Sequence, residues 1–365
     1  MSKRIEYIDI ARGIGILLVV MGHNDFALVS PFAYKVIYSF HMPLFFFLSG
    51  YFINTTAGFW NFSKKRFHSL LKPFLFTLFL IYFVSISFGK MGFENAMIRI
   101  VKSLYGTGRY IDWVQLWFLP HLFVVSLYAF IFYALMKKVD NRYVRWIVLL
   151  LTLGVSSLFL HSFYPFQLSV LGKSYELWGL PFSLDLVLLS GFFFILGSEA
   201  RQITSEQFFG NWVLLLAAGA ALILLNIFFG ARIDLNTRTY ESYVINTAES
   251  VVGILFILAL SRQLELHAAK LSSFFKYAGR ISLIILIFHV PIQDFWGQKI
   301  RGLTENAPLS IWVGFFMGVL GPILIYEIFI KHNPIASFWF GRTAEPPKAE
   351  VTQKEEVPAT ANPTP

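Results

Sequence analysis

The feature that most constrains the fold of this chain is a series of apolar blocks, each about twenty residues long, that recurs along the sequence. A helix of about 20 apolar residues crosses the hydrocarbon core of a bilayer, and other open structures would leave backbone groups unpaired in lipid. Only 14% of the 365 residues are charged, and 41 are Phe, whereas about 25% of an average soluble chain is charged. We therefore predict an all-α polytopic membrane protein.

Each apolar block is predicted to be one membrane-spanning helix, which gives about ten helices. The predicted spans are 8–24, 36–53, 73–89, 116–136, 144–161, 181–199, 211–229, 243–261, 281–297 and 308–330. An even number of spans places both termini on the same side. With a cytoplasmic N-terminus, the inner segments hold about twice as many Lys and Arg residues as the outer ones, so both termini are predicted to be cytoplasmic.

Residues 1–335 are expected to form one transmembrane domain. Residues 336–365 are rich in Pro, Ala, Thr and Glu, which predicts a disordered cytoplasmic tail. The net charge of +9 is explained by the cytoplasmic bias of Lys and Arg, and no basic stripe with stacking aromatics indicates a nucleic-acid partner. The absence of cysteine excludes disulfides and thiolate chemistry. No histidines stand at metal-ligand spacing, so no metal site is predicted.

Polar side chains share one face of the first apolar block. Arg12 and His23 are separated by almost three helical turns, or about 16 Å along the axis. Asp9 precedes Arg12 by one turn on the same face, where it can pair with the guanidinium group. A charge at the bilayer centre costs about 2.5–3.5 kcal/mol on insertion scales, so this face needs a partner or a wet cavity. The alternative is structural: Arg12 extends to the cytoplasmic surface and His23 lies in the outer interface.

The second block is predicted to begin near His41, with Pro43 in the first turn of its helix, where the missing N–H has no cost. His41 then lies at about the same depth as His23. A helix cap is the alternative to a chemical role for His41. Gly50 and its neighbour Ser49 would let another helix approach closely.

Two further segments contain candidate residues. Arg66 and Lys72 belong to a basic cluster before the third helix, which suits phosphate binding but also serves as an ordinary positive-inside signal. Pro291 follows His289 and is predicted to break the ninth helix; broken helices often line a cavity. His121, at the start of the fourth helix, is a weak signal on its own.

Several motifs together resemble a known family. They are IDIARGIGILLVVMGH, SFHMPLFFFLSGYF, KKR before a proline-led helix, WFLPHLF and GRISLIILIFHVPI. In this order they resemble acyltransferase family 3, a family of integral membrane O-acyltransferases, and its fucose 4-O-acetylase-like branch in particular. The matches extend from residue 5 to about 295, and the Arg–His spacing of the first helix is the most diagnostic element.

The resemblance implies an O-acetyltransferase of the bacterial cytoplasmic membrane. Such enzymes move an acyl group, usually acetyl, from acetyl-CoA or another acyl-CoA to a hydroxyl of a surface glycan or related sugar, with no bound cofactor. By position, the essential arginine and histidine of the family fall on Arg12 and His23. The family's basic pair falls near Arg66 and Ser69, where many relatives have a second arginine; here His68 or Lys72 would substitute.

The combined hypothesis makes His23 a general base or a transient acyl carrier. Arg12, Arg66 and Lys72 would bind the anionic end of the donor. The expected supporting residues are Asp9, His41, His68 and His289. Asp25 would orient the His23 imidazole only if the helix unwinds there.

The alternative from another functional class is a transporter or flippase for a lipid-linked glycan, without acyl transfer. Ten helices, a broken ninth helix and intramembrane ionisable groups fit that class as well. The sequence contains no recognisable pair of inverted halves. It leaves the identity of the acceptor and of the acyl group open.

Overall fold

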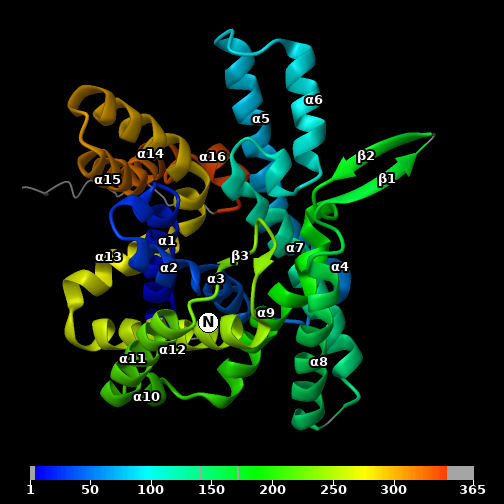
Figure 1. The fold of residues 1–365 in the computed structure, drawn as a ribbon, viewed down its shortest axis with the longest axis vertical. Helices are drawn as coiled ribbons and strands as arrows, with labels where there is room; N and C mark the ends of the chain where they lie inside the picture. Colours follow the sequence, from blue (N-terminus) through cyan, green and yellow to red (C-terminus); the bar gives the residue numbers. More distant parts are fainter. Residues whose placement is uncertain (1–4, 140, 171, 343–365) are drawn as a thin grey trace, which may run out of the picture.

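In a computed structural model, residues 5–139, 141–170 and 172–342 are described, and most of them are helical (Figure 1). The α-helices are α1 (Glu6–Gly22), α2 (Pro31–Tyr38), α3 (His41–Gly50), α4 (Phe59–Arg66), α5 (Lys72–Ser87), α6 (Phe93–Leu104), α7 (Phe118–Met136), α8 (Arg142–Leu160), α9 (Val187–Ile203), α10 (Glu206–Phe209), α11 (Trp212–Phe228), α12 (Tyr243–His267), α13 (Ala269–Arg280), α14 (Ser282–Thr304), α15 (Ala307–Ile325) and α16 (Pro334–Trp339). Residues 343–365 of the predicted tail lie outside the described residues, and residues 336–339 belong to α16.

The strands of the described residues form two antiparallel hairpins. They are β1 (Phe166–Val170) with β2 (Lys173–Leu177), and β3 (Ile233–Asp234) with β4 (Thr239–Tyr240). Short 3₁₀ or π-helical turns occur at Phe26–Leu28, Phe67–Leu71, Gly108–Tyr110, Val114–Trp117, Pro181–Leu186 and Tyr326–Ile330. The β1–β2 hairpin projects from the helical body, whereas β3 lies near its middle in the view of Figure 1.

Among the described residues, six helices are long and apolar enough to cross a membrane, or seven if the bent pair α13–α14 forms one span. The six are Phe59–Ser87, Val114–Met136, Arg142–Leu160, Pro181–Ile203, Tyr243–His267 and Ala307–Ile330. Each of them overlaps a predicted span, so the helical membrane fold is confirmed. The other predicted spans, 8–24, 36–53 and 211–229, correspond to the shorter helices α1, α2 with α3, and α11. The total of ten spans and the cytoplasmic termini stay predictions.

Helix α1 is enclosed by other helices. It packs against α3, α12, α13, α14 and α15, and its side chains Tyr7, Ile10 and Val20 are buried. Because α1 faces protein on most sides, its polar residues do not have to face lipid. This position explains how a helix that carries Asp9 and Arg12 is tolerated within an apolar bundle.

Glycines allow the helices around the site to approach closely. A Cβ atom on Gly279 of α13 would lie 2.0 Å from the carbonyl oxygen of Asp9 on α1. A Cβ atom on Gly50 of α3 would lie 1.7 Å from the carbonyl oxygen of Phe194 on α9. Any larger residue would force these helices apart. The close approach predicted for Gly50 is confirmed.

The single helix predicted over 36–53 is wrong, because the chain bends between α2 and α3. Phe40 leaves the helical region with φ −146°. Pro43 stands in the first turn of α3, as predicted, where its missing N–H would have no acceptor within the helix. The Ser39 carbonyl oxygen, which precedes α3, accepts a hydrogen bond from the Ser250 hydroxyl of α12 at 2.9 Å. The bend is therefore stabilised from α12.

The third helix begins earlier than the predicted span 73–89. It runs from α4 through the π-helical turn Phe67–Leu71 into α5. The wider turn immediately before Pro73 is one way for a helix to continue past a proline. The basic residues around Arg66 consequently lie within a helix and not in a loop before it.

The break predicted at Pro291 is also wrong. Helix α14 passes through Pro291 without interruption, and the chain bends by 83° between α13 and α14, at residue 281. Pro291 cannot donate to the carbonyl oxygen of Ile287. The buried Gln115 side chain replaces that donor, with its Nε2 atom 2.9 Å from the Ile287 oxygen. This contact lets α14 remain continuous.

Because the Gln115 side chain replaces the donor that Pro291 lacks, mutations at these two positions should not be additive. Gln115→Leu should lower the free energy of unfolding by about 1–3 kcal/mol, because the Ile287 carbonyl group stays buried without a donor. In a Pro291→Ala background the new backbone N–H satisfies that oxygen, so Gln115→Leu should cost much less. Thermal unfolding of the four purified proteins in one detergent measures the coupling. Equal losses in both backgrounds would contradict this account of α14.

Candidate active site

A cavity of about 270 Å³ lies against one face of α1. The α1 residues that line it are spaced by three or four positions: Asp9, Arg12, Ile16, Val19 and His23. This spacing places all of them on one face of a helix. The common face predicted for Asp9, Arg12 and His23 is therefore confirmed, and we call this space the central cavity.

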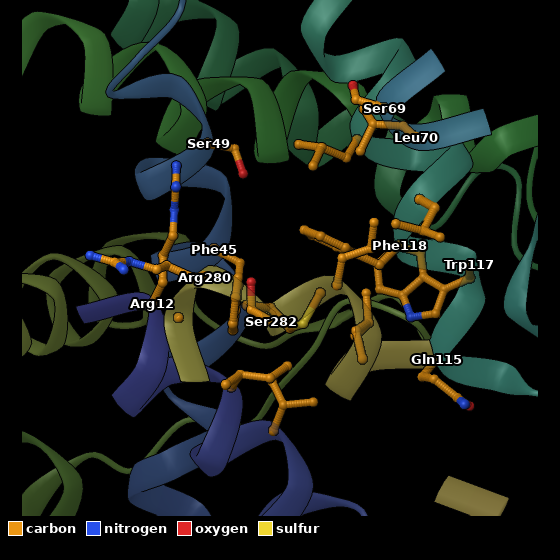
Figure 2. A pocket seen from close by; sticks show the side chains of 18 of the residues that line it. Arg12, Phe45, Ser49, Ser69, Leu70, Gln115, Trp117, Phe118, Arg280 and Ser282 are labelled. Atoms are coloured by element: carbon orange, nitrogen blue, oxygen red, sulfur yellow. The ribbon is translucent and has the colours of Figure 1, made fainter. Parts of the chain in front are cut away.

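One end of the central cavity is cationic. Atoms Nη1 of Arg12 and Nε of Arg280 each lie 4.0 Å from a different carboxylate oxygen of the buried Asp9. Arg12 also donates from Nη2 to the carbonyl oxygen of Leu48, 3.1 Å away. Figure 2 shows Arg12 and Arg280 on the same side of the cavity. Two guanidinium groups share one carboxylate, so a net positive charge faces the cavity and suits an anionic ligand.

Arg280 was not among the predicted site residues, although it stands in the quoted motif GRIS. It reaches the cavity because α13 ends at Arg280 and the chain then bends sharply into α14. The predicted pairing of Asp9 with Arg12 is confirmed, and Arg280 extends that pair to three groups.

His23 lies at the opposite end of the α1 face and directly follows the last residue of α1. Its Nδ1 atom is 2.9 Å from the carbonyl oxygen of Val19. A carbonyl oxygen only accepts, so Nδ1 carries the proton in the neutral imidazole and Nε2 keeps a free lone pair. The Gln293 side chain donates to the backbone oxygen of His23 at 2.7 Å. These contacts fix both the tautomer and the position of the ring.

Helix α1 ends at Gly22, so the condition for a contact between Asp25 and the His23 imidazole is met. The Nδ1 atom of His23, however, already contacts the carbonyl oxygen of Val19. Asp25 adopts a left-handed conformation with φ 57° and lines a smaller cavity on which His23 also borders. The structure therefore gives the orienting role to a backbone carbonyl group.

Two predicted supporting histidines lie near His23 but come from other helices. The His289 ring of α14 stands edge-on to the His23 ring, with centroids 5.2 Å apart. Its Nδ1 atom contacts the carbonyl oxygen of Ile285 at 2.9 Å, and its buried Nε2 atom has no hydrogen-bond partner among the described residues. His41 of α3 is held in the same way, with Nδ1 3.0 Å from the carbonyl oxygen of Ile37.

The opposite wall of the central cavity is aromatic. Figure 2 shows Trp117, Phe118 and Gln115 across the cavity from the two arginines. His121 is one turn beyond Trp117, but its hydrogen bonds are all to other parts of the protein. Both of its ring nitrogens are used, by the carbonyl oxygen of Phe182 and the hydroxyl group of Ser190.

The helix that carries the predicted basic cluster borders the central cavity through uncharged residues. Of that segment, Ser69 and Leu70 line the cavity, and no basic residue of the cluster is among the described lining residues. The cavity therefore meets this helix at Ser69 and Leu70.

The basic side chains of this segment have other neighbours. Lys72 places its Nζ atom 3.6 Å from the ring centre of Phe338 on α16. The guanidinium of Arg66 lies 5.3 Å from the ring centre of Phe62. His68 is exposed. Donor binding by Arg66 and Lys72, and substitution by His68, stay predictions.

Three cavities meet at His23. The second, of about 200 Å³, is lined by His23, Tyr38, His41, Met42, Val114, Trp117 and residues 233–236, and we call it the hairpin cavity. The third, of about 130 Å³, is lined by His23, residues of α14 and α15, and the loop after α1, and we call it the α14–α15 cavity. No cluster of three His, Asp or Glu side chains within the described residues could hold a metal ion. The meeting point suits general base chemistry between two bound molecules.

A family model described as an acyltransferase domain, that of acyltransferase family 3, matches residues 5–327 of the chain. The match includes α1, both sides of the central cavity and all three cavities at His23. No curated protein and no solved structure matches the chain.

Proposed function

Because the chain belongs to acyltransferase family 3, we propose that it moves an acyl group, most simply acetyl, from a cytoplasmic acyl-CoA to a hydroxyl group of a surface glycan or related sugar. The family and the apolar helices make it a multi-pass membrane acyltransferase. The bacterial cytoplasmic membrane, with about ten spans and both termini inside, is the setting that we propose. The family match favours this function over a transporter or flippase.

The observation that carries the proposal is the path of the central cavity. One cavity reaches from Arg12 and Arg280 at one end to His23 at the other. Arg12 and His23 are about 16 Å apart along the axis of a regular helix. A long, thin thioester donor with phosphates at one end fits this arrangement, with its anionic end at the arginines and its thioester near His23. The apolar middle of the cavity suits the uncharged arm between them.

In the proposed reaction, Nε2 of His23 takes the proton of the acceptor hydroxyl group. The oxygen then forms a bond to the thioester carbonyl carbon. The carbon–sulfur bond breaks, and the leaving thiolate takes up the proton from Nε2. The products are the sugar ester and free CoA. His289, in contact with the His23 ring, is a positioning residue in this scheme.

The direct test uses the purified full-length protein in detergent. Acetyl-CoA is incubated with candidate glycans, and both thioester loss and ester formation on the glycan are measured. We expect thioester loss that depends on the glycan and matches the ester formed. Glycan movement across a sealed bilayer without any thioester loss would favour the transporter and overturn the proposal. Mass spectrometry of surface glycans with and without the gene identifies the acceptor.

A further inference from the structure

The turn between β3 and β4 brings residues distant in the sequence to the active site. Asp234 and Asn236 line the hairpin cavity together with His23. The hairpin cavity and the central cavity share His23, Met42 and Trp117. The α14–α15 cavity shares only His23 with the central cavity. A molecule in the hairpin cavity would therefore be the better placed to meet a donor at His23.

The walls of the hairpin cavity suit a sugar ring. Tyr38 and Trp117 supply aromatic surface, on which the C–H face of a sugar packs. Asp234 supplies a carboxylate that accepts hydrogen bonds from sugar hydroxyls, and Asn236 supplies an amide nitrogen that donates them. The Oδ1 atom of Asn236 is buried against Gly108, where a Cβ atom would lie 2.1 Å from it. A pocket with aromatic walls and a few polar groups is typical of small-ligand sites.

The charge of the hairpin cavity points to one class of sugar. Asp234 is the carboxylate among its described lining residues, which include no lysine or arginine. A sugar with its own carboxylate would face Asp234, and no lysine or arginine of the described lining would offset the repulsion. An uncharged sugar has no such penalty.

The turn is held rigidly before any ligand arrives. Oδ1 of Asp234 accepts hydrogen bonds from the backbone N–H groups of Asn236 at 3.0 Å and Thr237 at 3.3 Å. Arg238 forms a buried ion pair with Asp185, with Nε 2.7 Å from Oδ2. Arg238 also donates to the backbone oxygen of Asn236 at 2.8 Å. A site fixed in advance loses less entropy when it binds a ligand.

We propose that the turn at residues 234–236 is the acceptor-recognition element, and that it selects an uncharged sugar ring over one that carries a carboxylate. This inference rests on the proposed function, because it assigns the acceptor of the same reaction. Asp234 and Asn236 determine specificity, and the Arg238–Asp185 pair positions them.

The α14–α15 cavity is the competing location. It is smaller, at about 130 Å³ against about 200 Å³. Its lining includes the charged residues Asp25, Asp294 and Arg301, and it lacks Trp, Tyr and Phe among the described lining residues. An acceptor there would depend on Arg301.

The test measures acetyl transfer by the full-length protein to methyl hexosides and to the matching methyl hexuronosides, which carry a carboxylate at C6. Wild type should prefer the uncharged hexoside by about tenfold or more in kcat/KM. Asp234→Asn keeps an oxygen for the turn but removes the charge, so this preference should shrink while the KM for acetyl-CoA stays the same. Asn236→Ala should raise the KM for both sugars by about tenfold.

Glu176→Gln is the matched control, because Glu176 is an exposed carboxylate on β2 and does not line the hairpin cavity. It should behave as wild type. An unchanged preference in Asp234→Asn, or a raised acceptor KM in Arg301→Gln, would overturn the inference and leave the proposed function intact. Thioester loss with no ester on any hexoside would also overturn the inference alone. No thioester loss by wild type with any acceptor would reject the proposed function and this inference with it.

Discussion

Replacing His23 by Gln or Ala should reduce acyl transfer by about 10²- to 10⁴-fold. Nδ1 is held by the Val19 carbonyl group, so Nε2 is the atom that remains to take the acceptor's proton. Neither replacement side chain can perform this step at neutral pH. The expected loss falls on kcat, measured as the rate of ester formation at saturating acetyl-CoA. CoA should still raise the unfolding temperature of the variants, because the arginine end of the central cavity is unchanged.

His161→Gln is the matched control for this experiment. His161 directly follows α8, as His23 directly follows α1, and it is exposed. It should retain wild-type activity. Wild-type activity in His23→Ala would disprove the catalytic assignment. An acyl-histidine, the other role for the same nitrogen, would add an acetyl group to the protein when acceptor is withheld, which intact-mass spectrometry detects.

Arg12→Gln should raise the KM for acetyl-CoA by about 10- to 100-fold, because a charge-assisted hydrogen bond to a phosphate is lost. A short thioester donor without phosphates, such as the acetyl thioester of N-acetylcysteamine, should be used equally well by wild type and the variant. Initial rates with both donors, at fixed acceptor concentration, give the comparison. Arg280→Gln should act in the same direction, since Arg280 shares Asp9 with Arg12.

The two donors separate binding from folding. Arg12 also holds the Leu48 carbonyl oxygen, so a purely structural role would impair both donors alike, and that outcome would contradict the donor-binding assignment. Arg142→Gln is the control, because Arg142 is an exposed arginine at the start of α8. It should leave the KM for acetyl-CoA unchanged.

The face of α1 could be predicted from the sequence because it depends on local geometry alone. Residues three and four apart in a helix lie on one face whatever surrounds them. Asp9, Arg12 and His23 therefore line one cavity, as their spacing predicts. The motif resemblance to acyltransferase family 3 is confirmed for the same reason, since it rests on short segments of fixed spacing.

The bends could not be predicted, because they depend on distant partners. Pro291 stands inside α14, which stays continuous, whereas the chain leaves the helical conformation at Phe40, before Pro43. The Ser39 carbonyl oxygen at the bend accepts from Ser250 on α12. The Ile287 carbonyl oxygen, which Pro291 leaves without a donor, accepts from Gln115, before α7. Which helix stays straight is thus decided by tertiary contacts that no local pattern reveals.

The residues that sequence reasoning missed are brought to the site by tertiary packing. Arg280 reaches Asp9 only because Gly279 lets α13 approach α1. Asp234 lines the cavity at His23 from a hairpin more than half the chain away. Lys72, chosen for its charge, contacts Phe338 on α16 instead of the central cavity. Composition and periodicity do not predict such long-range contacts.

The central claim is that the central cavity lets a donor on the cytoplasmic side meet an acceptor from the other side at His23. Sealed vesicles of known orientation test it most directly, with labelled acetyl-CoA supplied only at the cytoplasmic face and a membrane-impermeant glycan only at the opposite face. We predict that the label appears as an ester on the glycan, and that His23→Ala abolishes it. Ester formation only when both substrates are on the same face would contradict the account.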